Sequence, residues 1–182
     1  QKLRERVPDI CLRSTFIAGH PGETEEDFQM LLDFLRACEF DHVGVFAYSQ
    51  EEDTKSGQME QIPEEVRLAR RDRAMEVQHE IARKRNQAQV GRKLEVLVEG
   101  RSPRGRGWFV GRCYRQSPGI DGVILFRAPA GAQLRPGDMV QVAITGVQDY
   151  DLLGETTEPL TVDGVALDED LSLPVFTPSR HQ

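Results

Sequence analysis

The chain has 182 residues, 38% of them hydrophobic and 29% charged, and a formal net charge of −7. A membrane-spanning helix needs roughly 20 consecutive apolar residues, and no stretch of the sequence is that long. We therefore expect a soluble, intracellular protein. The negative charge excludes indiscriminate binding of nucleic acid over the whole surface, because phosphates would be repelled on average, so any RNA contact must be local.

The first predicted elements are a buried strand, a tight loop and a helix. Residues 12–18 form a short β-branched and aromatic run, and residues 19–22, Gly-His-Pro-Gly, end it in a loop. Thr24 is a good N-cap, and the acidic residues after it favour the positive end of a helix dipole. Apolar residues at helical spacing predict that one face of this helix packs on a sheet: Phe28, Leu31, Leu32 and Leu35.

A second strand and a long helix follow. Residues 43–47 predict another buried strand, which leads into a polar, charged loop at 48–57. A strand, a helix and a strand in this order predict parallel pairing. Residues 63–90, opened by a proline, have almost no helix breakers and alternate charges of both signs, which predicts a largely solvated helix. Its apolar stripe is expected to contain Ala74, Val77, Ile81 and Ala88.

After Gly91, short strands alternate with turns rich in glycine and proline. Strands at this spacing are typical of a small antiparallel barrel, and they are predicted at 93–99, 108–115, 122–127 and 139–147. We therefore expect three parts: residues 1–90, the small barrel at 91–155, and a flexible acidic tail at 156–182. Because the chain opens on Gln1 and its first residues resemble the interior of a domain, we also expect further sequence upstream.

The loops after the two early strands are the first candidate site. If the strands belong to a β/α barrel, the segments 19–23 and 48–53 lie side by side on its reactive face. Side chains alternate along a strand, so Arg13, Thr15 and Ile17 are expected to point the same way. An arginine that points into a barrel must meet an anion, since an unpaired buried charge is too costly. That anion is either a carboxylate of a bound ligand or an acidic residue on another strand.

Other residues near these loops have two interpretations each. The helix that begins near Thr24 could receive an anionic ligand at its N-terminus, or nearby glutamates could already occupy that position: Glu23, Glu25 and Glu26. His20 has no partner at ligand spacing, which favours a turn residue over a catalytic base. Tyr48 and Ser49 could contact a substrate or close the rim of the barrel. These residues alone indicate a barrel enzyme of unspecified chemistry.

The second part of the chain combines basic and aromatic residues. The basic ones are Arg92, Lys93, Arg101, Arg104, Arg106, Arg112 and Arg115, and the aromatic ones are Trp108, Phe109 and Tyr114. This combination suits RNA, where arginines meet phosphates and rings stack on bases. Alternatively, residues 101–107 are a solvated hairpin turn and Trp108 belongs to the core. A protein substrate with a basic surface would instead contact the acidic residues.

The three cysteines do not indicate a metal site. Cys11, Cys38 and Cys113 lie 27 and 75 residues apart, which matches neither a zinc site nor a disulfide framework. Each is expected to be a small buried hydrophobic residue.

Several motifs in order resemble one enzyme family. The run from Ser14 to Phe28 resembles the strand-and-loop signature of radical S-adenosylmethionine methylthiotransferases, and the segments 43–52 and 62–65 follow at the family's spacing. A module similar to the TRAM domain, a small OB-like barrel, begins at Val90 and closes with 150–154. The resemblance covers about residues 10 to 155.

Two further segments resemble one branch of this family. Residues 13–16 and 117–122 are similar to the RimO branch, which modifies an aspartate of a ribosomal protein. They are less similar to the MiaB branch, which modifies an adenosine of tRNA. A tRNA-modifying enzyme is therefore the first alternative, and a non-catalytic RNA-binding adaptor is the second.

The resemblance implies an α/β chain made of the C-terminal portion of a radical SAM β/α barrel, at 1–90, followed by an antiparallel TRAM barrel. In such an enzyme a reduced 4Fe-4S cluster splits S-adenosylmethionine, the resulting radical removes hydrogen from the aspartate β-carbon, and a second 4Fe-4S cluster helps to supply sulfur. By resemblance, Ile17 and Gly19 pack on the adenine of S-adenosylmethionine, and Arg13 contacts this cofactor or the substrate. The TRAM domain would hold the small-subunit ribosomal protein. The residues expected to bind substrate are Tyr48, Ser49, Arg106 and Arg112.

The sequence also departs from the family pattern. His20 stands where the family usually has Phe, the segment 53–55 replaces a more usual Gly-Thr-Pro, and the hairpin near Arg104 is unusually basic. The family's Cys-x-x-x-Cys-x-x-Cys motif does not occur in these 182 residues. Since thiolates hold iron–sulfur clusters, we expect this chain alone to bind no cluster and to be inactive.

Overall fold

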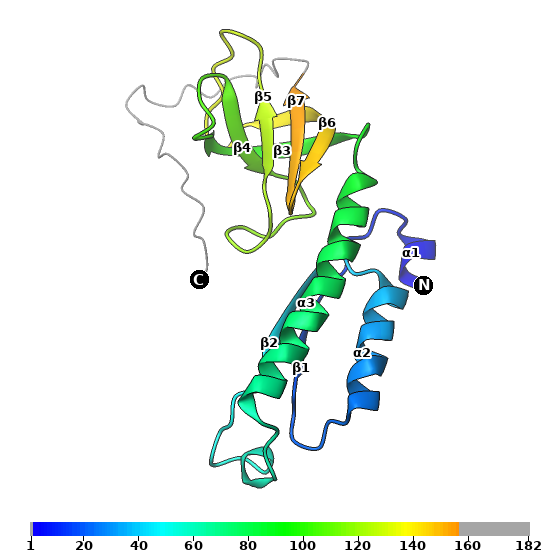
Figure 1. Cartoon of the computed structure of the whole chain (residues 1–182). Helices are drawn as coiled ribbons and strands as arrows, with labels where there is room; N and C mark the ends of the chain where they lie inside the picture. The colour runs from blue at the N-terminus through cyan, green and yellow to red at the C-terminus, as the bar shows by residue number, and fades with distance from the viewer. Residues whose placement is uncertain (1, 157–182) are drawn as a thin grey trace. The chain divides into compact units, whose positions relative to one another are not determined.

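The computed structural model describes residues 2–156 and divides the chain into two compact units, one ending at Arg85 and one beginning at Asn86 (Figure 1). The expected acidic tail lies outside the described residues, apart from Thr156. Within the described range, none of the helices has the length and apolar character needed to span a membrane.

Unit 1 contains the predicted strand–helix–strand order and a long helix. Its elements are α1 (Lys2–Arg6), β1 (Arg13–Ala18), α2 (Glu25–Cys38), β2 (His42–Ala47), the 3-10 turn η1 (Ser56–Gln58) and α3 (Glu64–Gln87). β1 and β2 pair in parallel, from Arg13 opposite His42 to Ala18 opposite Ala47, as predicted. α1 and η1 were not predicted, because neither has a strong periodic pattern.

One face of this small sheet forms the core of unit 1. Its buried cluster joins both strands to both long helices, with Ala18, Phe28, Leu32, Leu35, Val45, Ala74 and Ile81. The opposite face displays Arg13, Thr15 and Ile17, and Ile17 is 58% exposed. The predicted alternation along β1 is therefore confirmed.

The buried stripe of α3 differs from the expected one. It contains Arg70, Ala74, Gln78, Ile81 and Ala82, so two long polar side chains lie among the apolar ones. The expected member Ala88 is exposed and lies beyond Gln87, where the helix ends. Because charges of both signs alternate along the sequence, the burial of Arg70 and Gln78 could not be distinguished from solvent exposure.

In the described part of unit 2, five strands close into a barrel. They are β3 (Lys93–Arg101), β4 (Trp108–Arg112), β5 (Ile124–Arg127), β6 (Met139–Gln148) and β7 (Asp151–Thr156), in the order β3-β4-β5-β7-β6. The interior is aliphatic and aromatic, with Val96, Phe109, Phe126, Val140, Val142, Ile144 and Leu152 among its members. Trp108 is half-buried and does not belong to this core.

The expectation of an antiparallel barrel needs one correction. β5 and β7 pair in parallel, whereas the other four neighbouring pairs are antiparallel. A ring with an odd number of strands cannot alternate direction all the way round, so at least one parallel pair is required. The sequence pattern predicted only four strands, because it missed β7. A ring with an even number of strands can close with antiparallel pairs alone.

Gly111 in β4 provides a test of barrel packing. A Cβ there would overlap the Leu97 carbonyl oxygen and lie 2.7 Å from Val96 Cγ1. We expect Gly111→Ala to destabilise the barrel by about 1–3 kcal/mol, the usual cost of overpacking. Urea unfolding followed by the fluorescence of Trp108, the single tryptophan of the chain, measures this unit selectively.

Gly146 in β6 is the matched control, because a Cβ there would lie 3.7 Å from Leu153 Cδ1, an ordinary contact. Gly146→Ala should change the unfolding free energy by less than about 1 kcal/mol. Equal effects of the two substitutions would contradict the packing described for β3 and β4.

Candidate functional site

The loops that follow β1 and β2 lie next to each other, as predicted. The Tyr48 amide donates a hydrogen bond to the Ala18 carbonyl oxygen at 2.9 Å. The rings of His20 and Tyr48 meet edge to face, with their centroids 5.2 Å apart. His20 is exposed, and its Nδ1 lies 2.9 Å from the Pro21 carbonyl oxygen, which fits the expected turn residue.

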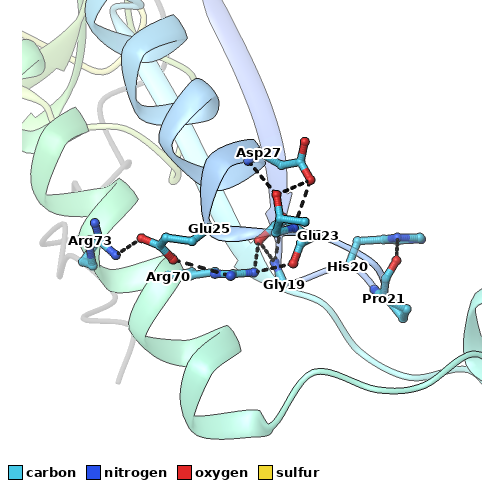
Figure 2. A network of polar contacts seen from close by, with 9 residues as sticks. Gly19, His20, Pro21, Glu23, Glu25, Asp27, Arg70 and Arg73 are labelled. Atoms are coloured by element: carbon cyan, nitrogen blue, oxygen red, sulfur yellow. Dashed lines mark hydrogen bonds and ion pairs between the residues drawn. The ribbon is translucent and has the colours of Figure 1, made fainter.

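A nearly buried ion pair holds the first loop (Figure 2). Both carboxylate oxygens of Glu23 accept hydrogen bonds from the Gly19 amide at 3.0 Å. Arg70 Nη1 of α3 donates to Glu23 Oε1 at 2.7 Å and to the Glu23 carbonyl oxygen at 3.1 Å. The two side chains are only 9% and 14% exposed. Gly19 itself has a φ of 79°, a conformation that favours glycine.

The N-terminus of α2 is occupied by side chains of this chain. Thr24 Oγ1 accepts from the Asp27 amide at 3.1 Å, and Asp27 Oδ2 accepts from the Thr24 amide at 2.9 Å, which is a reciprocal capping box. Glu25 accepts from Arg73 at 2.9 Å, and this hydrogen bond lowers the pKa of Glu25. Of the two earlier interpretations, the structure therefore supports acidic side chains at this position, with Asp27 as the capping partner.

A cavity of about 320 Å³ opens beside the second loop, lined by Ala47, Tyr48, Ser49, Gln50, Glu64, Arg67 and Leu68. Arg67 Nη1 donates to the Tyr48 carbonyl oxygen at 2.6 Å. The Tyr48 hydroxyl is buried and has no hydrogen-bond partner among the residues that the structure describes. The expected substrate residues Tyr48 and Ser49 thus lie together on one cavity wall.

The cofactor residues expected from the resemblance lie along β1 and its end. Ile17 and Arg13 are on the exposed face of the sheet, and Gly19 begins the loop. Sequence reasoning missed Arg67 and Arg70, which hold the two loops from α3. A signal was available, because Arg70 precedes Ala74 by four residues and so lies on the same helical stripe.

The basic residues of unit 2 differ in their surroundings. Arg112 Nε pairs with Glu99 Oε1 at 2.8 Å, and Arg106 is exposed. Arg115 is buried, only 5% exposed, so it does not belong to the expected basic surface. The guanidinium groups of Arg104 and Arg127 lie over the Trp108 ring, 5.3 and 5.8 Å from its centroid. We call Arg104, Trp108 and Arg127 the arginine–tryptophan patch.

The three cysteines differ in their burial. Cys113 is buried and its Sγ lies 3.2 Å from Gln116 Oε1, whereas Cys11 and Cys38 are partly buried. Across residues 2–156 no group of three histidine, cysteine or acidic side chains is arranged to hold a metal ion.

Comparison with known proteins identifies relatives of both units. The TRAM domain family matches residues 90–157. The "Ribosomal protein uS12 methylthiotransferase RimO" of Symbiobacterium thermophilum is 87% identical over all 182 residues, which span 38% of that protein. Proteins of the same name from Pelotomaculum thermopropionicum and Desulfitobacterium hafniense are 54% and 49% identical over 85% and 86% of the chain, and 35% of each protein is covered. The chain therefore spans little more than a third of these relatives.

The capping box of α2 predicts a pH-dependent stability. Hydrogen bonds from the Thr24 amide and then from its hydroxyl lower the pKa of Asp27. Such a carboxyl stabilises the folded state above its unfolded-state pKa, and this contribution is lost as the pH falls through the lowered value. Asp27→Asn should thus be less stable than wild type at neutral pH, and the difference should vanish in acid. Urea unfolding followed by circular dichroism at a series of pH values measures it.

Thr24→Ser is the control, because serine keeps the hydroxyl oxygen that accepts from the Asp27 amide. It should keep the pH dependence of wild type. A difference between Asp27→Asn and wild type that stays constant from neutral to acid pH would contradict the role given to Asp27.

Proposed function

We propose that this chain, which is related along its whole length to the RimO methylthiotransferases and carries a TRAM domain, completes the cofactor-binding barrel of such an enzyme and docks its protein substrate. The observation that supports this most strongly is the 87% identity over all 182 residues. The whole enzyme would add a methylthio group to the β-carbon of an aspartate in a small-subunit ribosomal protein.

The named relatives favour a ribosomal protein over tRNA as the substrate. The three relatives described above all bear the name of a ribosomal protein uS12 methylthiotransferase. A non-catalytic adaptor is disfavoured for the same reason. Because ribosomal proteins are made and assembled in the cytoplasm, the cytoplasm is the location that we propose.

Residues at the end of β1 suit S-adenosylmethionine. Ile17 is an exposed apolar side chain on which an adenine ring can pack, and Arg13 on the same face carries a charge that suits a carboxylate. Gly19 must lack a side chain, since a Cβ there would overlap the Arg67 side chain. These residues fit the cofactor, and their part is to bind and orient it beside the two loops.

The iron–sulfur clusters do not fit the residues of this chain. S-adenosylmethionine and two 4Fe-4S clusters supply the hydrogen abstraction and the sulfur transfer in the whole enzyme. Clusters need several thiolates close together, and the described residues contain no such group. We therefore assign both clusters to the remainder of the enzyme and expect this chain alone to be inactive.

Substrate contacts are proposed on both units. Tyr48 and Ser49 line the cavity beside the second loop, which can receive a substrate side chain. In the TRAM domain, Arg106 is exposed and Arg112 is paired with Glu99. An exposed arginine and an ion pair of this kind can hydrogen-bond to a protein surface, so we propose that they help to hold the ribosomal protein.

A local contact with RNA is a second proposal for the TRAM domain. The arginine–tryptophan patch presents two cations stacked on a half-buried ring. Arginines of this kind can reach phosphates, and the ring edge can contact a base. Such a contact would be made with the RNA that surrounds the ribosomal protein.

The substrate can be tested with the full-length protein that carries this segment, reconstituted with both clusters and supplied with S-adenosylmethionine. We expect mass spectrometry to find a methylthio group on an aspartate of uS12 and no modification of a tRNA anticodon stem-loop. The isolated chain, assayed in parallel, should modify neither. Modification of the tRNA in place of uS12 would refute the proposal.

The RNA contact can be tested by fluorescence anisotropy with single-stranded ribosomal RNA fragments at several salt concentrations. If Arg104 and Arg127 each neutralise a phosphate, replacing either with Gln should reduce the slope of log K against log salt by about 0.7. Arg71→Gln is the control, because Arg71 lies on α3 and pairs with its neighbour Asp72. An unchanged slope in both patch variants would exclude this role.

A further inference from the structure

Arg70 is a buried cation whose contacts all lead to the loop after β1 and the start of α2. The whole residue is 7% exposed. Its Nη1 contacts the carboxylate and carbonyl oxygen of Glu23, its Nη2 lies 3.5 Å from Glu25 Oε2, and its guanidinium lies 5.6 Å from the centre of the Phe28 ring. Within residues 2–156 its Nε has no hydrogen-bond partner. The short ion pair with Glu23 is therefore the main contact that offsets the desolvation of Arg70.

Arg70 acts on Gly19 through Glu23. The Glu23 carboxylate lies between them, with one oxygen 2.7 Å from Arg70 Nη1 and both oxygens 3.0 Å from the Gly19 amide nitrogen (Figure 2). Without the cation, the carboxylate would be free to turn toward water, because charged groups are better solvated there. The Gly19 amide would then lose its acceptor, and the left-handed turn at Gly19 would lose its main restraint.

Arg67, one turn earlier on α3, packs against the same loop. Its Cβ lies within 2.9 Å of the place where a Gly19 Cβ would be, so its stem packs directly on the Gly19 backbone. Its Nη1 donates to the Tyr48 carbonyl oxygen of the second loop at 2.6 Å. The first turns of α3 thus hold both loops.

We propose that Arg70 is a positioning residue for S-adenosylmethionine: through Glu23 it holds the Gly19 backbone in the conformation that accepts the cofactor. This inference rests on the proposed function, in which Ile17 and Gly19 contact the adenine. Arg70 itself is nearly buried, so in this proposal it acts through Glu23 and not by contact with the cofactor. Its loss should weaken cofactor binding and leave docking of the ribosomal protein unchanged.

The test uses the full-length protein that carries this segment and compares Arg70→Met with wild type. Without any ligand, hydrogen exchange of a peptide that contains Gly19 should become about tenfold faster, as expected when a charge-assisted hydrogen bond is lost. The KM for S-adenosylmethionine should rise by about tenfold while kcat changes by less than about threefold, since binding and not chemistry is affected. The affinity for uS12, measured separately, should stay the same.

Two further variants separate positioning from general stability. Arg70→Lys keeps the charge and should restore part of the exchange protection and of the cofactor affinity. Glu23→Gln keeps Arg70 but weakens the acceptor for Gly19, and it should reproduce the effect of Arg70→Met. If Arg70→Met does not fold, these two variants decide the question, because Arg70→Lys keeps a positive charge at this position and Glu23→Gln leaves Arg70 packed on Phe28.

Arg73→Met is the matched control. Arg73 also lies on α3, pairs with Glu25 at 2.9 Å and lies 4.9 Å from the centre of the Phe28 ring, but its side chain is 48% exposed. It should leave both exchange and KM unchanged. Normal hydrogen exchange and a normal KM in Glu23→Gln would overturn the inference about Arg70. Loss of exchange protection and of cofactor affinity in Arg73→Met, to the same extent as in Arg70→Met, would do the same. Neither result would contradict the proposed function. A wild-type enzyme that binds no S-adenosylmethionine would overturn the proposed function, whereas the exchange result is independent of it.

Discussion

The parallel ladder between β1 and β2 determines where the candidate site of this chain lies. Strands that run in the same direction end at the same edge of their sheet, so the loops after Ala18 and Ala47 become neighbours. The same ladder separates two faces, because side chains alternate along each strand. One face packs on α2 and α3, and the other displays Arg13 and Ile17. The exposed face and the adjacency of the two loops both follow from this one pairing.

α3 shows how a highly charged helix can still belong to a core. Several of its polar residues each meet a group at the end of a strand or in a connection. Arg70 contacts Glu23, Gln78 Nε2 donates to the Phe40 carbonyl oxygen at 3.0 Å, and Arg85 Nε pairs with the buried Asp41 at 3.0 Å. Buried polar groups are costly unless they are hydrogen-bonded, so these contacts select one position of the helix along the sheet. This position of α3 also determines the conformation of the two loops, because Arg67 and Arg70 contact them.

In our proposal the two units of this chain have different roles. Unit 1 offers an exposed strand face and two restrained loops, which suit a small cofactor. The TRAM domain offers a closed barrel, whose interior is filled by side chains, so that its binding capacity lies on its surface. Because the chain spans little more than a third of its relatives, the groups that hold the clusters belong to the remainder of the enzyme in this proposal.

Local patterns were sufficient for much of the fold. Alternation and helical spacing predicted β1, α2 and β2, the N-cap at Thr24 and the adjacency of the two loops, because each depends on short-range geometry or on a simple rule of chain direction. The sequence did not reveal that Arg70 and Arg115 are buried, since the exposure of a long charged side chain depends on distant segments packed over it. Nor did it predict β7 or the parallel pairing of β7 with β5. That pairing follows from closing a ring of five strands, which is a property of the whole barrel and of none of its segments.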